Sequence, residues 1–213
     1  MTEFLRSKMI ERPEWLRREN RDWDAIYSQH SLAEIRWHSD KPDQELIDLI
    51  ENSGIETRRT LDVGCGAGTD AIYLASKGSQ VTAIDISHEA VRIARERAKK
   101  AGVKIDFISG NFLDVEFDNE SFDFINDRGC FHHMNPLARE NFARKISDVL
   151  KSNGYYFLRC WSDKEEESER GPYRLSKGDI ENIFSKFFEV GEIKDFRFGG
   201  KGARGYACLM RKR

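Results

Sequence analysis

Between residues 60 and 161, short apolar runs alternate with segments of helical periodicity. The run from Val81 to Ile86 is almost continuously apolar, as strands buried on both faces of a sheet are. Ser87 can cap the helix that follows, which reaches Gly102 with small apolar residues at helical spacing. Repeated alternation of this kind predicts a parallel sheet with right-handed crossovers. We therefore predict an α/β fold built on a doubly wound, mostly parallel sheet.

The last third of the chain departs from this alternation. A helix beginning at Asn135 and Pro136 is expected to end at Gly154, before a strand over 155–161. The charged segment 162–174 lacks periodicity and predicts a mobile loop over one end of the sheet. A capped helix from Ser176 and two strands around 189–198 and 204–211 follow. The two strands are close enough to form an antiparallel hairpin at the end of the chain.

The N-terminal region has a different composition from the rest. Residues 1–41 hold Trp15, Trp23 and Trp37 among nearly balanced charges, a segment too polar to fold alone. We expect it to form a helical cap that docks on the main domain, residues 42–213. Its tryptophans either roof a pocket or anchor a helix to the core.

Charge and cysteine usage limit the possible partners. The 213 residues carry 35 Lys and Arg against 37 Asp and Glu, a net charge of −2. This near-balance argues against a nucleic-acid partner, and no apolar run is long enough for a membrane span. Four separated cysteines, with no signal-peptide pattern, favour reduced thiols in the cytoplasm. The pattern Cys130-x-His132-His133 lacks the spacing of zinc ligands, so we expect no metal.

A glycine-rich loop between the first predicted strand and helix is the most informative motif. Glycines at every second position, 64, 66 and 68, allow a sharp turn and let a ligand lie against bare backbone. Asp85 closes the next strand, where an acid is placed to accept two hydrogen bonds from the hydroxyls of a ribose. A dinucleotide fingerprint requires a third glycine where Asp70 stands. This disfavours a nicotinamide-dependent oxidoreductase.

These residues resemble the first motif of the class I S-adenosylmethionine-dependent methyltransferases, an acidic residue and an apolar residue followed by G-x-G-x-G. The resemblance covers roughly residues 58–160, including Asp62, Asp85, G-N-F at 110–112 and F-D at 122–123. It implies the Rossmann-like methyltransferase fold, a seven-stranded sheet whose last strand is reversed. It also implies S-adenosylmethionine as the cofactor.

The resemblance implies a set of cofactor-binding residues. Asp62 would reach the methionine amino group, Asp85 the ribose hydroxyls, and Ile86 the adenine ring. Asn111 stands where the family often has an acid near the adenine amino group, and Asp114 competes for that role. The implied set is Asp62, Gly64, Cys65, Gly66, Gly68, Asp85, Ile86, Asn111, Phe112 and Asp127.

In this family the residues after the fourth strand face the transferred methyl group. Asp127, His132 and His133 are therefore the catalytic candidates, able to take a proton from the acceptor or to orient it. Neighbouring histidines point in different directions, so we expect at most one to face the pocket. Arg128 can pair with Asp127 or with an acidic substrate. With Trp37, it forms the predicted substrate-binding set.

The function predicted from sequence is methyl transfer to a small soluble acceptor by a monomer or homodimer without nucleic-acid or membrane partners. Asp127 and Arg128 resemble the corresponding stretch of the thiopurine and thiol S-methyltransferases and of the related tellurite-resistance enzymes. This favours a thiol or another soft nucleophile as the acceptor. Methylation of oxygen or nitrogen, and a protein that binds the cofactor without turnover, are the alternatives.

Overall fold

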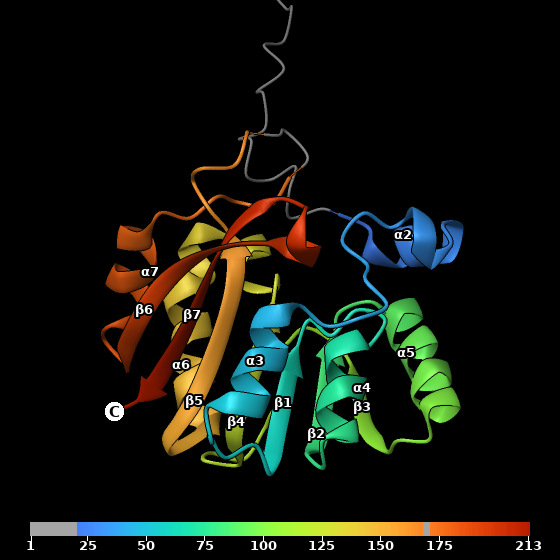
Figure 1. Cartoon of the computed structure of the whole chain (residues 1–213), viewed down its shortest axis with the longest axis horizontal. Coiled ribbons are helices and arrows are strands. Elements are labelled where there is room, and N and C mark those ends of the chain that lie inside the picture. The colour runs from blue at the N-terminus through green and yellow to red at the C-terminus, as the bar shows by residue number, and fades with distance from the viewer. Residues whose placement is uncertain (1–20, 168–170) are drawn as a thin grey trace, which may run out of the picture.

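The computed structural model describes residues 21–167 and 171–213. They form an α/β fold around one seven-stranded sheet of order β3-β2-β1-β4-β5-β7-β6 (Figure 1). β7 runs antiparallel to both of its neighbours, whereas the pairs among the first five strands are parallel. The predicted fold and its C-terminal hairpin are thus confirmed. The strands are β1 (Arg59–Val63), β2 (Gln80–Asp85), β3 (Ile105–Ser109), β4 (Phe122–Arg128), β5 (Leu150–Trp161), β6 (Phe188–Arg197) and β7 (Arg204–Lys212).

Helices cover both faces of the sheet (Figure 1). One core cluster joins the sheet to α3 (Gln44–Asn52), α4 (Thr69–Ser76) and α5 (His88–Ala101). The other joins it to α6 (Arg139–Val149) and α7 (Lys177–Phe184). Since both faces are buried, the central strands can be apolar on both sides, which is the pattern seen in the sequence.

One predicted boundary is wrong. The sequence predicts that Gly154 ends the helix before the fifth strand, but α6 ends at Val149 and Leu150 already belongs to β5. Gly154 lies inside β5, where an added Cβ would be 2.9 Å from the carbonyl oxygens of Asp123 and Lys151. The glycine is therefore needed for the close approach of two strands at a register shift, not for a helix cap.

The described part of the N-terminal region lies over the carboxyl ends of the strands. It contains α2 (Trp23–Gln29) and a short 3-10 helix, η1 (Leu32–Glu34), and α2 lies above α5 in Figure 1. Asp24 fixes it there by accepting hydrogen bonds from the Ser87 hydroxyl (2.7 Å) and the Glu89 backbone N–H (3.0 Å). Trp15 falls outside the described residues.

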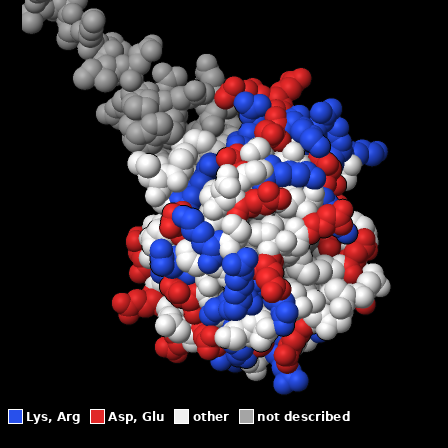
Figure 2. Space-filling view, turned by 90° about the vertical axis from the view of Figure 1, so that its left-hand side faces the viewer, with Lys and Arg blue, Asp and Glu red and all other residues white. Residues whose placement is uncertain are grey.

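Three further 3-10 helices lie in the connections: η2 (Phe131–His133), η3 (Pro136–Ala138) and η4 (Phe198–Gly200). Asn135 caps η3 through its side-chain oxygen, so the helical segment begins where the sequence predicted. No helix in residues 21–167 or 171–213 is long and apolar enough to cross a bilayer. Acidic and basic side chains are interspersed on the face that Figure 2 shows.

Candidate active site

A cavity of about 1000 Å³ opens at the carboxyl edge of the sheet. Its wall is built from the ends of strands on both sides of the β1–β4 pair, where the strand order reverses. Ligands of doubly wound sheets bind at such a switch point. One half of the cavity is formed by the ends of β1, β2 and β3, and the other half by the ends of β4 and β5 with α2 and η4.

The glycine loop forms the floor between the two halves. Gly64 and Gly66 have φ angles of 70° and 51°, in the left-handed region that favours glycine. A Cβ on Gly64 would lie 2.7 Å from the Cβ of Cys130, and one on Gly66 would lie 2.7 Å from the Tyr27 hydroxyl. Side chains at these positions would therefore fill the cavity floor or displace its neighbours.

Asp85 and Ile86 form the wall beside this loop. Asp85 accepts a hydrogen bond from the Gly66 backbone N–H at 2.7 Å and another from the Ser87 N–H at 2.9 Å. Burial raises the pKa of this carboxyl group, and the two backbone donors oppose the rise. Ile86 is 54% exposed although it is apolar. An exposed apolar side chain beside a fixed carboxylate suits a flat base joined to a ribose.

The loop after β3 contributes Asn111 and Phe112 to the same half of the cavity. The Asn111 amide donates to Asp114 at 3.0 Å and accepts from the Leu113 N–H at 3.1 Å. The two residues that competed for one role in the sequence therefore form a single hydrogen-bonded turn. Of the two, Asn111 lines the cavity.

Asp62, at the end of β1, is part of a buried polar network. Its Oδ1 accepts from the Asn126 amide at 2.7 Å, and its Oδ2 is buried without a hydrogen-bond partner among the described residues. Asn126 also donates to Asp70 (3.2 Å) and accepts from Arg159 (2.6 Å). Arg159, fully buried in β5, donates to Asp70 at 2.7 Å and approaches Asp43 at 3.4 Å. Burial, and then the Asp70 charge, raise the pKa of Asp62 to about 7.

These features fit S-adenosylmethionine. The open oxygen of Asp62 is a position for an ammonium group, because a buried carboxylate oxygen requires a donor. The backbone of Gly64 and Gly66 lies in the cavity wall without side chains of its own, and Asp85 with Ile86 suits the adenosine end of the ligand. All four residues line the cavity together with Asp62.

Aromatic side chains line the other half of the cavity. Trp23 makes edge-to-face contacts with Trp37 and His133, with ring centroids 5.5 and 4.9 Å apart. The ring centroids of Trp161 and Phe198 lie 6.3 and 6.1 Å from that of His132. Aromatic rings in edge-to-face contact form a rigid wall that favours a flat ligand.

The structure does not bring Asp127 to this cavity. Its carboxylate is fully buried and accepts hydrogen bonds from the backbone N–H groups of Cys130 (2.8 Å) and Phe131 (3.1 Å) and from the Tyr156 hydroxyl (2.9 Å). Burial raises its pKa to about 6. Asp127 thus holds the turn after β4 together and does not line the cavity.

Arg128 and Trp37 do line the cavity. The sequence offered Asp127 as an ion-pair partner of Arg128, but the partner in the structure is Asp43, at 2.6 Å. Asp43 also accepts a hydrogen bond from the Gly199 backbone N–H at 2.9 Å. Arg128 donates a further bond to the Trp37 carbonyl at 3.0 Å. The guanidinium therefore fastens α3, η4 and the N-terminal segment to the end of β4.

Most of the predicted site residues come together, and several contributors were missed. Apart from Gly68, which caps α4 and packs on Ala94, and Asp127, all the predicted cofactor-binding residues line the cavity. So do both His132 and His133, although the sequence predicted that at most one of them would face the pocket. Tyr27, Asp70, Trp161 and Phe198 were not predicted. Their sequence contexts are those of ordinary core or loop residues, so no local pattern marks them.

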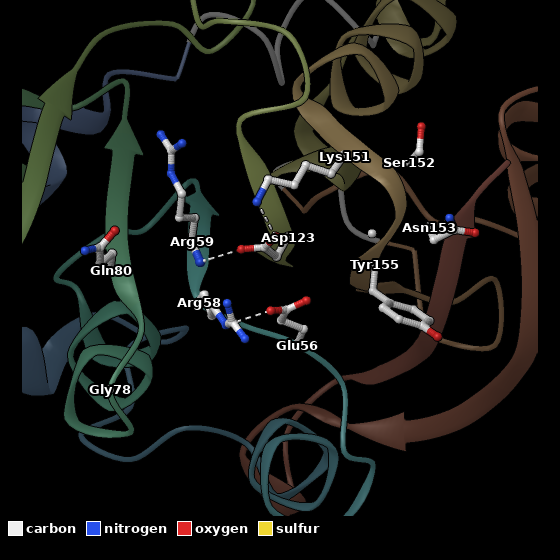
Figure 3. Close-up of a pocket in the computed structure, with 11 residues that line it drawn as sticks. Glu56, Arg58, Arg59, Gly78, Gln80, Asp123, Lys151, Ser152, Asn153 and Tyr155 are labelled. Atoms are coloured by element: carbon white, nitrogen blue, oxygen red, sulfur yellow. Dashed lines mark hydrogen bonds and ion pairs between the residues drawn. The ribbon is translucent and has the colours of Figure 1, made fainter.

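A second cavity, of about 690 Å³, lies at the opposite edge of the sheet (Figure 3). Both carboxylates in its wall are paired with cations, Glu56 with Arg58 at 2.7 Å and Asp123 with Lys151 at 2.6 Å. Asp123 also accepts from the Arg59 backbone N–H at 2.8 Å. The bonds made by Asp123 join the amino ends of β1, β4 and β5, so these charges stabilise that end of the sheet.

Comparisons with known proteins agree with the cofactor fit. The methyltransferase domain family matches residues 60–154. An uncharacterized methyltransferase of Schizosaccharomyces pombe is 31% identical over 118 residues, which are 55% of this chain and 79% of that protein. The 2-heptyl-1-hydroxyquinolin-4(1H)-one methyltransferase of Mycobacteroides abscessus is 25% identical over 168 residues, 78% of this chain and 74% of that protein.

A solved structure from work on the conversion of a disulfide bond into a thioacetal group during echinomycin biosynthesis has the same fold. It superimposes with a TM-score of 0.76 at 21% identity and covers 89% of this chain and 90% of that one. Fold, cavity and relatives together define a Rossmann-like protein that binds S-adenosylmethionine. The chain belongs to the class I S-adenosylmethionine-dependent methyltransferases and is an enzyme of that family.

Proposed function

We propose that the enzyme methylates a small, flat, ring-containing acceptor at oxygen or nitrogen. The observation that carries this proposal is the aromatic wall of the acceptor half of the cavity, made by Trp23, Trp37, Trp161, Phe198 and His133. A stack or edge contact with these rings fixes a flat molecule with little loss of conformational freedom. The Mycobacteroides abscessus relative, named for a quinolone substrate, supports a ring acceptor.

The residues of this chain perform three tasks in the reaction. Bound S-adenosylmethionine supplies a methyl group already activated on a sulfonium. Asp62, Asp85 and the glycine loop orient it along the floor of the cavity. The aromatic wall places the acceptor behind the methyl group and excludes water, and holding two reactants in line in this way can be worth ~7 kcal/mol or more.

We also infer that the N-terminal segment acts as the cap of this site. Tyr27 lies against Gly66, and Trp37 donates from its indole nitrogen to the Tyr27 hydroxyl at 3.2 Å. Burial, the largest effect, raises the pKa of this hydroxyl, which therefore stays protonated. Its place over the glycine loop, with α2 fixed to α5 by Asp24, supports a role in covering the bound cofactor.

The test is release of S-adenosylhomocysteine in the presence of hydroxylated aromatic rings, nitrogen heterocycles, aromatic thiols and aliphatic thiols. We expect turnover with flat rings and little with aliphatic thiols. Trp37→Ala should raise KM for ring acceptors about tenfold with little effect on the KM for the cofactor, while Lys99→Ala, an exposed change on α5, serves as a matched control. Turnover confined to aliphatic thiols would refute this proposal. It would favour the thiol acceptor predicted from the sequence on the basis of Asp127 and Arg128.

A further inference from the structure

His132 is held in one tautomer by the end of β5. The backbone N–H of Trp161 donates a hydrogen bond to His132 Nδ1 at 3.0 Å. A backbone amide can only donate, so Nδ1 accepts and carries no proton. In a neutral ring the proton must then be on Nε2.

The surroundings keep this ring neutral. His132 is only 5% exposed, and this burial is the main reason that its pKa lies well below the usual value for histidine. The adjacent His133 and three arginines from different segments disfavour a second proton further. Those arginines are Arg21, Arg128 and Arg139.

Asp43 offsets one of these cations, Arg128, through their 2.6 Å ion pair, and the other acidic groups on the adjoining segments have partners of their own. Asp127 is engaged by two backbone N–H groups and Tyr156, as described above. Glu165, in the wall of the cavity, accepts from the Arg204 backbone N–H. Asp163 accepts from the Tyr206 hydroxyl at 2.8 Å. The cavity wall therefore contains the guanidinium groups of Arg21 and Arg128 beside His132, and its Glu165 carboxylate is held by a backbone N–H.

The Nε2–H group is left for a ligand. His132 and Gly129 both line the cavity, and no residue that the structure describes is hydrogen-bonded to Nε2. Nε2 lies 3.0 Å from where a Cβ on Gly129 would be, so a side chain at position 129 would crowd the imidazole ring. Gly129 has a φ of 91°, which a larger residue would rarely adopt.

We propose that His132 is a hydrogen-bond donor to the acceptor and not its general base, and that the acceptor binds as a ring oxyanion. This inference rests on the function proposed above and names the acceptor class. The acceptor's proton leaves to solvent before binding. The oxyanion then provides the electron pair of the new C–O bond, and the pair of the broken C–S bond stays with sulfur. The products are a neutral ether and S-adenosylhomocysteine, and His132 keeps its proton throughout.

The tautomer can be measured in the protein itself. Long-range ¹H–¹⁵N spectra of the ¹⁵N-labelled chain distinguish the two neutral forms and the cation for each of the five histidines. We expect His132 to be neutral with its proton on Nε2 from pH 6 to 8. His30 is an internal control of the opposite kind, because its Nδ1 lies 3.1 Å from the Ile26 carbonyl, which can only accept. A proton on Nδ1 of His132, or on both nitrogens in that range, would overturn the proposal.

Binding of two matched probes tests the acceptor class. With S-adenosylhomocysteine present, 4-nitrophenolate should bind, and nitrobenzene, which has a similar shape but no oxyanion, should bind more weakly. His132→Met removes the donor and should weaken 4-nitrophenolate about tenfold or more, as expected for one charge-assisted hydrogen bond of ~1.5–3 kcal/mol. The same change should alter nitrobenzene binding by less than about threefold, while His132→Gln, which keeps an N–H, should retain most of the phenolate affinity.

These outcomes separate the two proposals. Equal losses for both probes in His132→Met, or no binding of 4-nitrophenolate to the unaltered enzyme, would refute the oxyanion acceptor. Turnover of nitrogen heterocycles with the expected His132 tautomer but no phenolate preference would keep the proposed function and reject this inference. With phenol acceptors of different acidity, the midpoint of the kcat/KM pH profile should move with the acceptor's own pKa. A fixed midpoint would indicate an enzyme base.

Discussion

Replacing Asp62 by asparagine should stabilise the free enzyme at alkaline pH and weaken its binding of S-adenosylmethionine. Burial and the nearby Asp70 raise the pKa of Asp62 to about 7 from an ordinary value of 3.8. Because the pKa in the folded state is the higher one, the stabilising contribution is complete at low pH and is lost as the pH rises through about 7. This rise in the pKa corresponds to about 4 kcal/mol. That figure is an upper value for the free energy of unfolding that is lost when Asp62 is ionised at pH 8.

The amide introduced by Asp62→Asn would keep the hydrogen bond from Asn126 and remove the uncompensated charge. The free energy of unfolding from urea titrations should therefore be equal for the two proteins at pH 4 and higher for the variant at pH 8. Calorimetry should give a Kd for the cofactor about ten to a hundred times weaker, since one charge-assisted hydrogen bond is lost. Asp106→Asn, at an exposed position in β3, is the matched control. A variant that is no more stable at pH 8, or that binds the cofactor as tightly as before, would refute this reasoning.

Three further substitutions test separate parts of the site. Asp85→Ala should weaken retention of S-adenosylhomocysteine about a hundredfold in equilibrium dialysis, because two ribose hydrogen bonds of ~1.5 kcal/mol each are removed; unchanged retention would contradict the assignment. Asp127→Ala should lower the free energy of unfolding by about 3 kcal/mol, because it leaves two backbone N–H groups and the Tyr156 hydroxyl unpaired. A variant that keeps its stability and loses only activity would instead indicate that Asp127 is catalytic. Asp24→Ala should release α2 and raise hydrogen exchange in residues 23–29 more than in α5, and equal protection in both proteins would show that other contacts hold α2.

The fold could be predicted because its signals are local. Continuous apolar runs, helix caps such as Ser87 and the spacing of Asp85 from the glycine loop are all read from neighbouring residues. The misplaced boundary at Gly154 has the opposite origin. A glycine after a helical pattern resembles a helix stop, and only the partner strand, whose Asp123 carbonyl approaches within 2.9 Å of its Cβ position, shows why it is there.

The candidate site divides in the same way. The proposed cofactor half depends on one contiguous motif and one neighbouring strand, and nearly all the residues predicted there line the cavity. The acceptor half depends on contacts between distant segments, such as Trp161 with His132 and Arg128 with Asp43. The order of side chains around the turn after β4 decides that Asp127 faces inward and His132 faces the cavity. Sequence spacing does not contain that information.

The buried polar chain described above links the two halves of the cavity. It runs from the Gly199 N–H through Asp43, Arg159 and Asn126 to Asp62, and Arg159 is the cation within it. Losing one partner of a buried ion pair usually costs about 3–5 kcal/mol, so a single exchange of Asp43 or Arg159 should destabilise the fold. Libraries designed to change acceptor preference through the hairpin should vary Asp43 and Arg159 jointly or leave both intact.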